Sequence, residues 1–170
     1  MVRDNLWLKT KLEYLWVRYF PDLEKSNVVM VTFGRYARFR FASIKYQQKS
    51  LFSKGVTLIT VSSMFKSEKI PEEVVLYSLA HELAHYAHGF SSSGKKKHKH
   101  PHRGGVVDKE IELRGLAVLV KSYKAWLVEY RQMIRDGHGQ QILKDQQYRQ
   151  MIQNGRRVTF SSFFDRLRDK

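Results

Sequence analysis

The sequence predicts an α+β fold in which a small three-stranded sheet is packed with helices. Leu6–Phe20 has apolar residues at close to helical spacing and is followed by Pro21, so we expect a helix there. Three short strand-like segments follow, and two long helical patterns come after Pro71. A length of 170 residues is enough for one domain with a buried core.

The three expected strands are Val28–Phe33, Tyr36–Tyr46 and Val56–Val61. Their short connections favour an antiparallel meander. Apolar and basic residues alternate in the second segment, but the alternation changes phase near Ala42–Ser43, which predicts a β-bulge there. The third segment, Val56–Val61, is expected to be an edge strand able to hold an extended peptide.

Two helices complete the expected fold. The first covers Glu72–His88 and is ended by Gly89, with acidic residues in its first turn. The second runs from Val106 to about Arg135 as one helix. Its apolar stripe is expected to contain Leu113, Leu116, Val120, Trp126 and Leu127.

The composition limits the chemistry that this chain can use. It has no cysteine, so a disulfide framework, a cysteine-ligated zinc ribbon and a thiol nucleophile are excluded, and a metal site must use His, Glu or Asp. No segment approaches the ~18 apolar residues of a membrane span, and the opening segment is charged throughout. We therefore expect no membrane partner and a cytoplasmic protein.

The net charge of +15 indicates a polyanionic partner. Positive charge is concentrated in residues 35–54, 95–120 and 121–170 and is absent from the segment between the first two. DNA, single- or double-stranded, is the partner that this charge favours, with a nucleoid-associated location if the source is prokaryotic. The candidate nucleic-acid-binding residues are basic side chains from two segments: Arg38, Arg40, Lys95, Lys96 and Lys97.

The motif that carries chemistry is His81-Glu82-Leu83-Ala84-His85, an HExxH sequence inside a predicted helix. Residues i and i+4 share one helix face, so both imidazoles can reach one Zn²⁺ ion. Glu82 is then placed to act as general base toward a water molecule. A catalytic zinc also needs a third protein ligand. The downstream candidates are His98, His100 and His102 in a basic loop, and Glu110 or Glu112 in the following helix.

The segment LAHELAHYAHGF, followed by a basic loop with HPHRGG, resembles the SprT-like zinc metallopeptidases, the group of bacterial SprT and Spartan-type protease domains. The resemblance covers residues 1–125 and implies a zincin-like catalytic domain, followed by a basic, mostly helical extension at 126–170. It implies a third zinc ligand in the loop after the motif, for which we choose His102 because it follows Pro101 at the junction with the next helix. The resemblance also implies DNA-associated or DNA-crosslinked protein substrates. The zinc ribbon of many members is missing.

Two alternatives remain open. The segment EIELRGLAVLV is similar to the glutamate helix of ImmA/IrrE-like and minigluzincin peptidases, which would make Glu112 the third ligand. The chain could also be a nucleic-acid-binding protein whose metal site is not catalytic. A repeat of YRQMI at 130–134 and 148–152 does not separate these interpretations.

Overall fold

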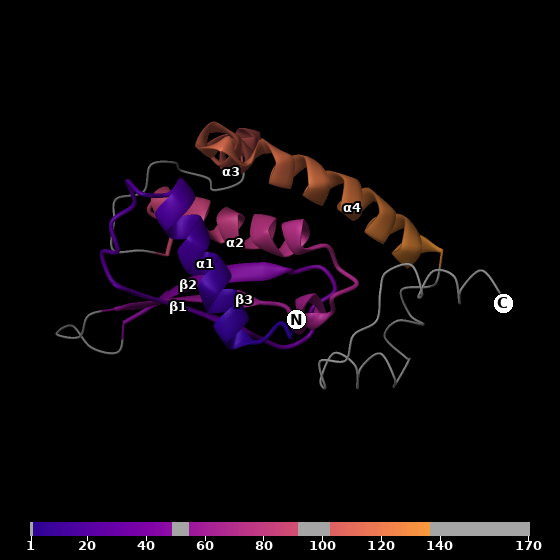
Figure 1. The fold of residues 1–170 in the computed structure, drawn as a ribbon, viewed down its shortest axis with the longest axis horizontal. Helices are drawn as coiled ribbons and strands as arrows, with labels where there is room; N and C mark the ends of the chain where they lie inside the picture. Colours follow the sequence, from indigo (N-terminus) through magenta and orange to yellow (C-terminus); the bar gives the residue numbers. More distant parts are fainter. Residues whose placement is uncertain (1, 49–54, 92–102, 137–170) are drawn as a thin grey trace.

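A computed structural model describes residues 2–48, 55–91 and 103–136. It is a mixed α+β structure, as the sequence predicts. Figure 1 shows the sheet on one side of the molecule, the long helix α2 next to it, and the last helices on the far side of α2. The elements in chain order are α1 (Asn5–Tyr19), β1 (Val28–Phe33), β2 (Ala42–Gln47), β3 (Val56–Val61), a 3₁₀ turn (Ser63–Lys66), α2 (Glu72–Ala87), a second 3₁₀ turn (Arg103–Gly105), α3 (Val106–Ile111), a π-helical turn (Glu112–Leu116) and α4 (Ala117–Arg135).

The sheet differs from the expected meander. The strand order is β1-β3-β2, with β1 parallel to β3 and β2 antiparallel to it. The expectation of an antiparallel sheet was therefore wrong for β1, and β3 is the central strand of the described sheet rather than an edge. Burial explains this choice, because Ile59 and Val61 of β3 are fully buried and the flanking strands cover both of its edges.

The second strand is also shorter than expected. It begins at Ala42, and its register with β3 is continuous from Ala42–Val61 to Gln47–Val56, so the predicted bulge is absent. The phase change in the sequence marks the start of the strand instead. Arg38 and Arg40 consequently lie in the irregular segment that leads into β2 and do not project from a strand face.

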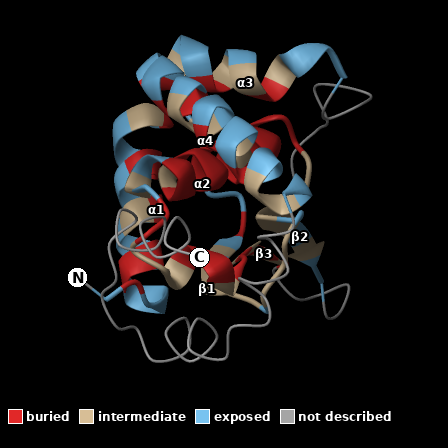
Figure 2. Cartoon of the chain, turned by 90° about the vertical axis from the view of Figure 1, so that its right-hand side faces the viewer, coloured by how far each residue is buried: buried red, intermediate tan, exposed pale blue. Residues whose placement is uncertain are grey.

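Helix α2 is the centre of the core. Its N-cap is Pro71, Glu72 and Glu73 occupy its first turn, and Gly89 follows it with a φ of 78°. The helix is buried over most of its length, as Figure 2 shows by colour. It packs on α1, on β2 and β3, and on α3 and α4. Its own core residues include Val75, Leu79 and Leu83, as the sequence predicts.

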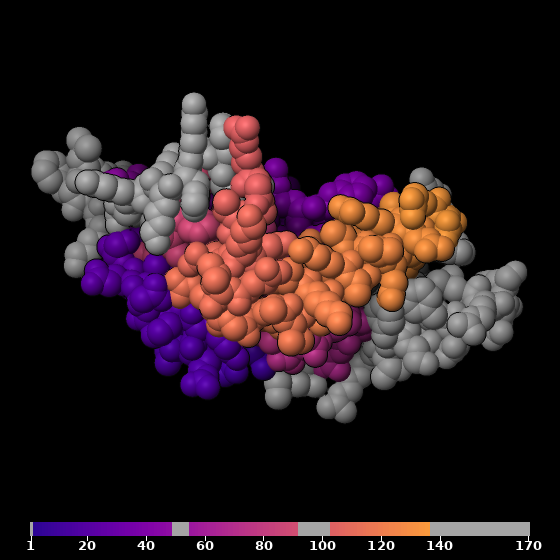
Figure 3. Space-filling model, turned by 90° about the horizontal axis from the view of Figure 1, so that it is seen from above, coloured from indigo at the N-terminus to yellow at the C-terminus, as the bar shows by residue number. Residues whose placement is uncertain are grey.

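The last helical region is broken where the sequence predicts one helix. Gly115 adopts a φ of 83°, and the π-helical turn around it separates α3 from α4. The break turns α4 across α2, and seen from above α4 runs over one surface of the molecule (Figure 3). It also shifts the apolar stripe, so that Leu113 is 86% exposed whereas Leu116, Val120 and Trp126 are buried.

Helix α4 crosses the expected domain boundary at residue 125. Trp126 and Tyr130 are buried and stack on each other with ring centroids 4.8 Å apart, and both rings contact Phe41. The core of the protein therefore includes these two residues. Residues 137–170 of the expected extension, including the second YRQMI copy, lie outside the described residues. None of the helices in the described ranges is long and apolar enough to cross a membrane.

Candidate metal centre

Helix α2 brings the two motif imidazoles together. The Nε2 atoms of His81 and His85 are 3.1 Å apart, and their rings are almost perpendicular at 81°. Two nitrogens bound to one tetrahedral zinc, each at about 2.05 Å, would be separated by about 3.4 Å. His85 is 5% exposed, and His81 is half-buried. The pair therefore has the spacing and the shielded surroundings of two ligands of one metal ion.

Glu82 is buried beside this pair. Its side chain is 4% exposed, and burial raises the pKa of its carboxyl to about 8. A divalent cation held by the neighbouring imidazoles would act in the opposite direction and favour the carboxylate. Because burial raises the pKa of this carboxyl group and a bound cation would lower it, the group is suited to accept a proton and release it again near neutral pH.

A hydrogen-bonded relay of Tyr77, Asp108 and Lys124 contacts the Nδ1 side of the His81 ring. The Tyr77 hydroxyl donates to Asp108 Oδ1 over 2.6 Å and lies 3.4 Å from His81 Nδ1. Lys124 Nζ contacts the other oxygen of Asp108 at 2.9 Å. Burial would raise the pKa of Asp108, but the hydrogen bonds from Tyr77 and Lys124 outweigh it and hold the pKa below its usual value.

This relay selects the tautomer of His81. Asp108 is a carboxylate and can only accept, so Tyr77 must donate to it. Burial, followed by this hydrogen bond, raises the pKa of Tyr77 far above its usual value, which keeps the hydroxyl protonated. Only a lone pair of Tyr77 then faces His81, so Nδ1 carries the proton and Nε2 is left as a metal ligand.

The sequence reasoning missed Tyr77 and Asp108. Tyr77 precedes His81 by four residues, so the helical period alone places it on the same face one turn earlier. Asp108 has no such local signal, because its position depends on how α3 packs against α2.

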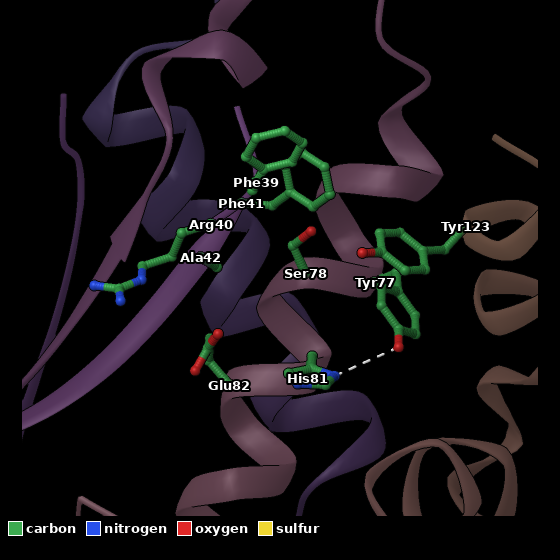
Figure 4. Close-up of a pocket in the computed structure, with 9 residues that line it drawn as sticks. All are labelled: Phe39, Arg40, Phe41, Ala42, Tyr77, Ser78, His81, Glu82 and Tyr123. Carbon is green, nitrogen blue, oxygen red and sulfur yellow. Dashed lines mark hydrogen bonds between the residues drawn. The ribbon is translucent and has the colours of Figure 1, made fainter. Parts of the chain in front are cut away.

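A cavity of about 280 Å³ opens beside Glu82. It lies between α2 and the segment that leads into β2, with α4 on a third side, and Figure 4 shows the side chains around it. The cavity joins the motif to a region rich in aromatic rings. Its lining residues are Phe39, Arg40, Phe41, Ala42, Tyr77, Ser78, His81, Glu82 and Tyr123.

The next histidine, His88 at the C-cap of α2, belongs to a different network. It is 2% exposed, and its Nε2 lies 3.4 Å from Glu110 Oε2. Glu110 also accepts a hydrogen bond from Arg114, which in turn pairs with Asp22. These contacts tie the C-cap of α2, α3, the π-helical turn and the segment after α1 together. Glu110, a candidate ligand from the sequence, is thus engaged by Arg114 and His88.

The remaining candidate ligands are not brought to the histidine pair in the described structure. Glu112 is exposed on the π-helical turn. Within residues 2–48, 55–91 and 103–136, no group of three His, Asp or Glu side chains is placed to hold one ion. The loop candidates His98, His100 and His102 lie outside the described residues, so His102 stays a prediction.

Of the candidate nucleic-acid-binding residues, two lie in the described part of the chain and three lie outside it. Arg40 is exposed and lines the cavity, and the Arg38 guanidinium lies 4.6 Å from the centre of the Phe39 ring. Arg40 is therefore close to the motif helix, whereas the backbone carbonyl of Arg38 accepts a hydrogen bond from Tyr130 of α4. Lys95, Lys96 and Lys97 are outside the described part of the chain.

Comparisons of the chain with protein-family models, with curated proteins and with solved structures found no match.

Proposed function

We propose that this protein is a zinc-dependent metalloendopeptidase. The observation that supports this most is the 3.1 Å approach of His81 Nε2 to His85 Nε2, with the buried carboxyl of Glu82 lining the same open cavity as His81. Two imidazoles and an adjacent carboxyl group are the donors that a hydrolytic zinc site requires from its motif helix.

Each residue has a defined role in this proposal. His81 and His85 would hold Zn²⁺ together with a third ligand, predicted to be His102. Bound zinc supplies Lewis-acid polarisation of the scissile carbonyl and lowers the pKa of a water molecule to about 7. Glu82 takes the proton of the attacking water and passes it to the leaving amine, which its position at the cavity edge allows. Tyr77 holds the His81 ring in its ligating tautomer.

The substrate peptide would lie along β2. In the described sheet β2 pairs with β3 on one side, which leaves its other edge as the candidate for strand addition. The residues immediately before β2 line the cavity together with Glu82. An extended peptide added to this strand would therefore pass the motif. This assignment replaces Val56–Val61, which is the central strand.

The substrate class that we propose is DNA-associated or DNA-crosslinked protein. The net charge of +15 supports contact with a polyanion, and Arg40 places a basic group next to the cavity. The resemblance to SprT-like peptidases points to the same class. A nucleic-acid-binding protein with a non-catalytic metal site is the second candidate, because it is supported by the same charge.

Cleavage of a basic DNA-binding protein separates these functions. Zinc-loaded wild type and Glu82→Gln are incubated with this substrate alone, with single-stranded DNA and with duplex DNA. Glu129→Gln, at an exposed position of α4, is the matched control. We expect DNA-stimulated cleavage by wild type and control, and a loss of at least a hundredfold in Glu82→Gln with zinc content unchanged. Cleavage that is indifferent to DNA would remove the DNA assignment. DNA binding without cleavage would favour the non-catalytic protein.

A further inference from the structure

The cavity beside Glu82 has walls made of aromatic rings. Phe39 and Phe41 lie at one end, and Tyr77 and Tyr123 lie on one side, as seen in Figure 4. The rings of Tyr77 and Tyr123 stack with centroids 4.0 Å apart, and Phe41 meets Tyr123 edge-to-face at 6.4 Å. These contacts hold three of the four rings in fixed orientations, so the pocket is formed before any ligand enters.

The floor of the cavity is formed by two small side chains. Ser78 lies one helical turn before Glu82, is 4% exposed and donates its hydroxyl hydrogen to the Val74 carbonyl. Ala42, the first residue of β2, faces it across the cavity. Two short side chains opposite each other leave space between larger rings. The hydroxyl of Tyr77 is directed to Asp108 and His81, so the wall that Tyr77 contributes is its ring.

The charges at the cavity disfavour a charged occupant. Glu82 closes one end and Arg40 lies at the side, with its guanidinium extending away from the tyrosine rings (Figure 4). A charged side chain would meet one group of opposite charge and one of like charge here, so it would gain little net attraction while losing its water between the rings. A neutral side chain avoids this penalty. The ring walls favour an aromatic one, because edge-to-face and offset contacts add to the burial of apolar area.

We propose that this cavity is a specificity pocket that receives a large apolar, preferentially aromatic, side chain next to the scissile bond. This inference rests on the proposed peptidase function and adds a substrate preference to it. Phe39 supports it further, because its ring is 72% exposed at the cavity rim. A peptide side chain entering the pocket would cover that ring and remove apolar area from water.

Binding and cleavage are measured with one peptide series in which a single position is Phe, Leu, Ala, Lys or Glu. The position is chosen by mapping cleavage sites in a peptide mixture digested by the zinc-loaded wild type, and defaults to the centre of the peptide if nothing is cleaved. Affinity is measured with zinc-loaded Glu82→Gln, so that peptides stay intact. We expect the Phe peptide to bind and to be cleaved about tenfold or more better than the Ala peptide, with Lys and Glu poorest.

Two variants alter the pocket in opposite ways. Ala42→Leu fills it and should move the preference from Phe toward Ala, whereas Phe39→Ala removes the exposed rim and should lower the Phe-to-Ala ratio several-fold. Because Phe39 is exposed, its variant tests the pocket even if Ala42→Leu fails to fold. Met30→Ala, an exposed position on β1, is the control and should leave the ratio unchanged.

The outcomes separate the two proposals. Cleavage without a preference for Phe, or a preference that neither variant changes, would overturn the pocket and leave the peptidase. Absence of cleavage with a Phe preference in binding that Phe39→Ala reduces would keep the pocket and overturn the peptidase. Absence of both cleavage and binding preference would overturn both.

Discussion

The Tyr77 hydroxyl donates a hydrogen bond of 2.6 Å to Asp108 Oδ1, and this contact joins the motif helix α2 to α3. Because the same hydroxyl oxygen lies 3.4 Å from His81 Nδ1, it determines which nitrogen of His81 is available to a metal. The packing of α3 against α2 therefore orients the His81 ring as a metal ligand. Groups that orient metal ligands in this way typically contribute 10–100-fold to metal affinity.

Removal of the Tyr77 hydroxyl should weaken zinc binding. We expect Tyr77→Phe to raise the zinc Kd about tenfold or more, since the ring stack is kept and only the relay is lost. Asp108→Asn should act in the same direction. Tyr123→Phe, which alters the ring stacked on Tyr77, is the matched control. The Kd is measured by competition with a chromophoric chelator. An unchanged Kd in Tyr77→Phe would show that the contact is structural only.

Gly115 should resist substitution because of its backbone conformation. Its φ of 83° lies in the left-handed region, and a Cβ there would meet no atom within 4 Å, so the penalty is conformational and not steric. We expect Gly115→Ala to lower the free energy of unfolding by about 1–2 kcal/mol. Val118→Ala, at an exposed position three residues later, should change it far less. Equal effects of the two in urea denaturation would argue against a conformational requirement for glycine at this turn.

Trp126 should anchor α4 to the rest of the protein. It is 6% exposed, and its ring contacts Phe41, Phe65 and Tyr130. We expect Trp126→Ala to cost about 3–5 kcal/mol of unfolding free energy, as for other buried large aromatics. Val128→Ala, which is 62% exposed, is the neighbouring control. A chain ending at residue 125 should be equally impaired. A stable, soluble 1–125 fragment would show instead that the fold does not need residues 126–135 of α4.

Glu110 should make stability depend on pH in the acidic range. Burial would raise its pKa, but the hydrogen bonds from Arg114 and His88 outweigh it and hold the pKa below the usual value of about 4.3. His88 on α2, Arg114 on the π-helical turn and, through Arg114, Asp22 are the charged or titratable groups around it. A lowered carboxyl pKa stabilises the folded state above the unfolded pKa, and this contribution is lost as the pH falls through the folded value.

Glu110→Gln tests this dependence. At pH 7 the free energy of unfolding of the variant should be about 1 kcal/mol lower than that of the wild type. This difference should shrink as the pH is lowered below about 4.5. Urea denaturation at several pH values measures it. Glu129→Gln, at an exposed position of α4, should show no such convergence. A difference that stays constant with pH would show that Glu110 acts through packing instead of charge.

Local patterns in the sequence predicted the parts of the fold that depend on local geometry. The HExxH helix, with both imidazoles on one face, follows from the helical period, and the structure places the two Nε2 atoms 3.1 Å apart. The parallel pairing of β1 with β3 could not be predicted in this way. It depends on which strand the core buries most deeply, and short connections suggested the simpler meander.

The errors in the last helical region have one physical cause. A lone glycine inside an apolar helical pattern is usually tolerated, so Gly115 gave no clear stop signal. In the structure it takes a left-handed conformation, and the π-helical turn around it moves Leu113 out of the apolar stripe. Asp108 was missed for a related reason, because it reaches Tyr77 only through the packing of α3 on α2.

Zinc stoichiometry is the most direct test of the central claim that His81 and His85 share one metal ion. Purified protein is loaded with zinc, dialysed and analysed by mass spectrometry of the metal, together with His81→Ala, His85→Ala and His88→Gln. We predict one zinc per chain in the wild type and in His88→Gln, whose histidine faces Glu110, and loss of zinc in the two motif variants. Zinc-free wild type, or zinc retained by both motif variants, would contradict the account.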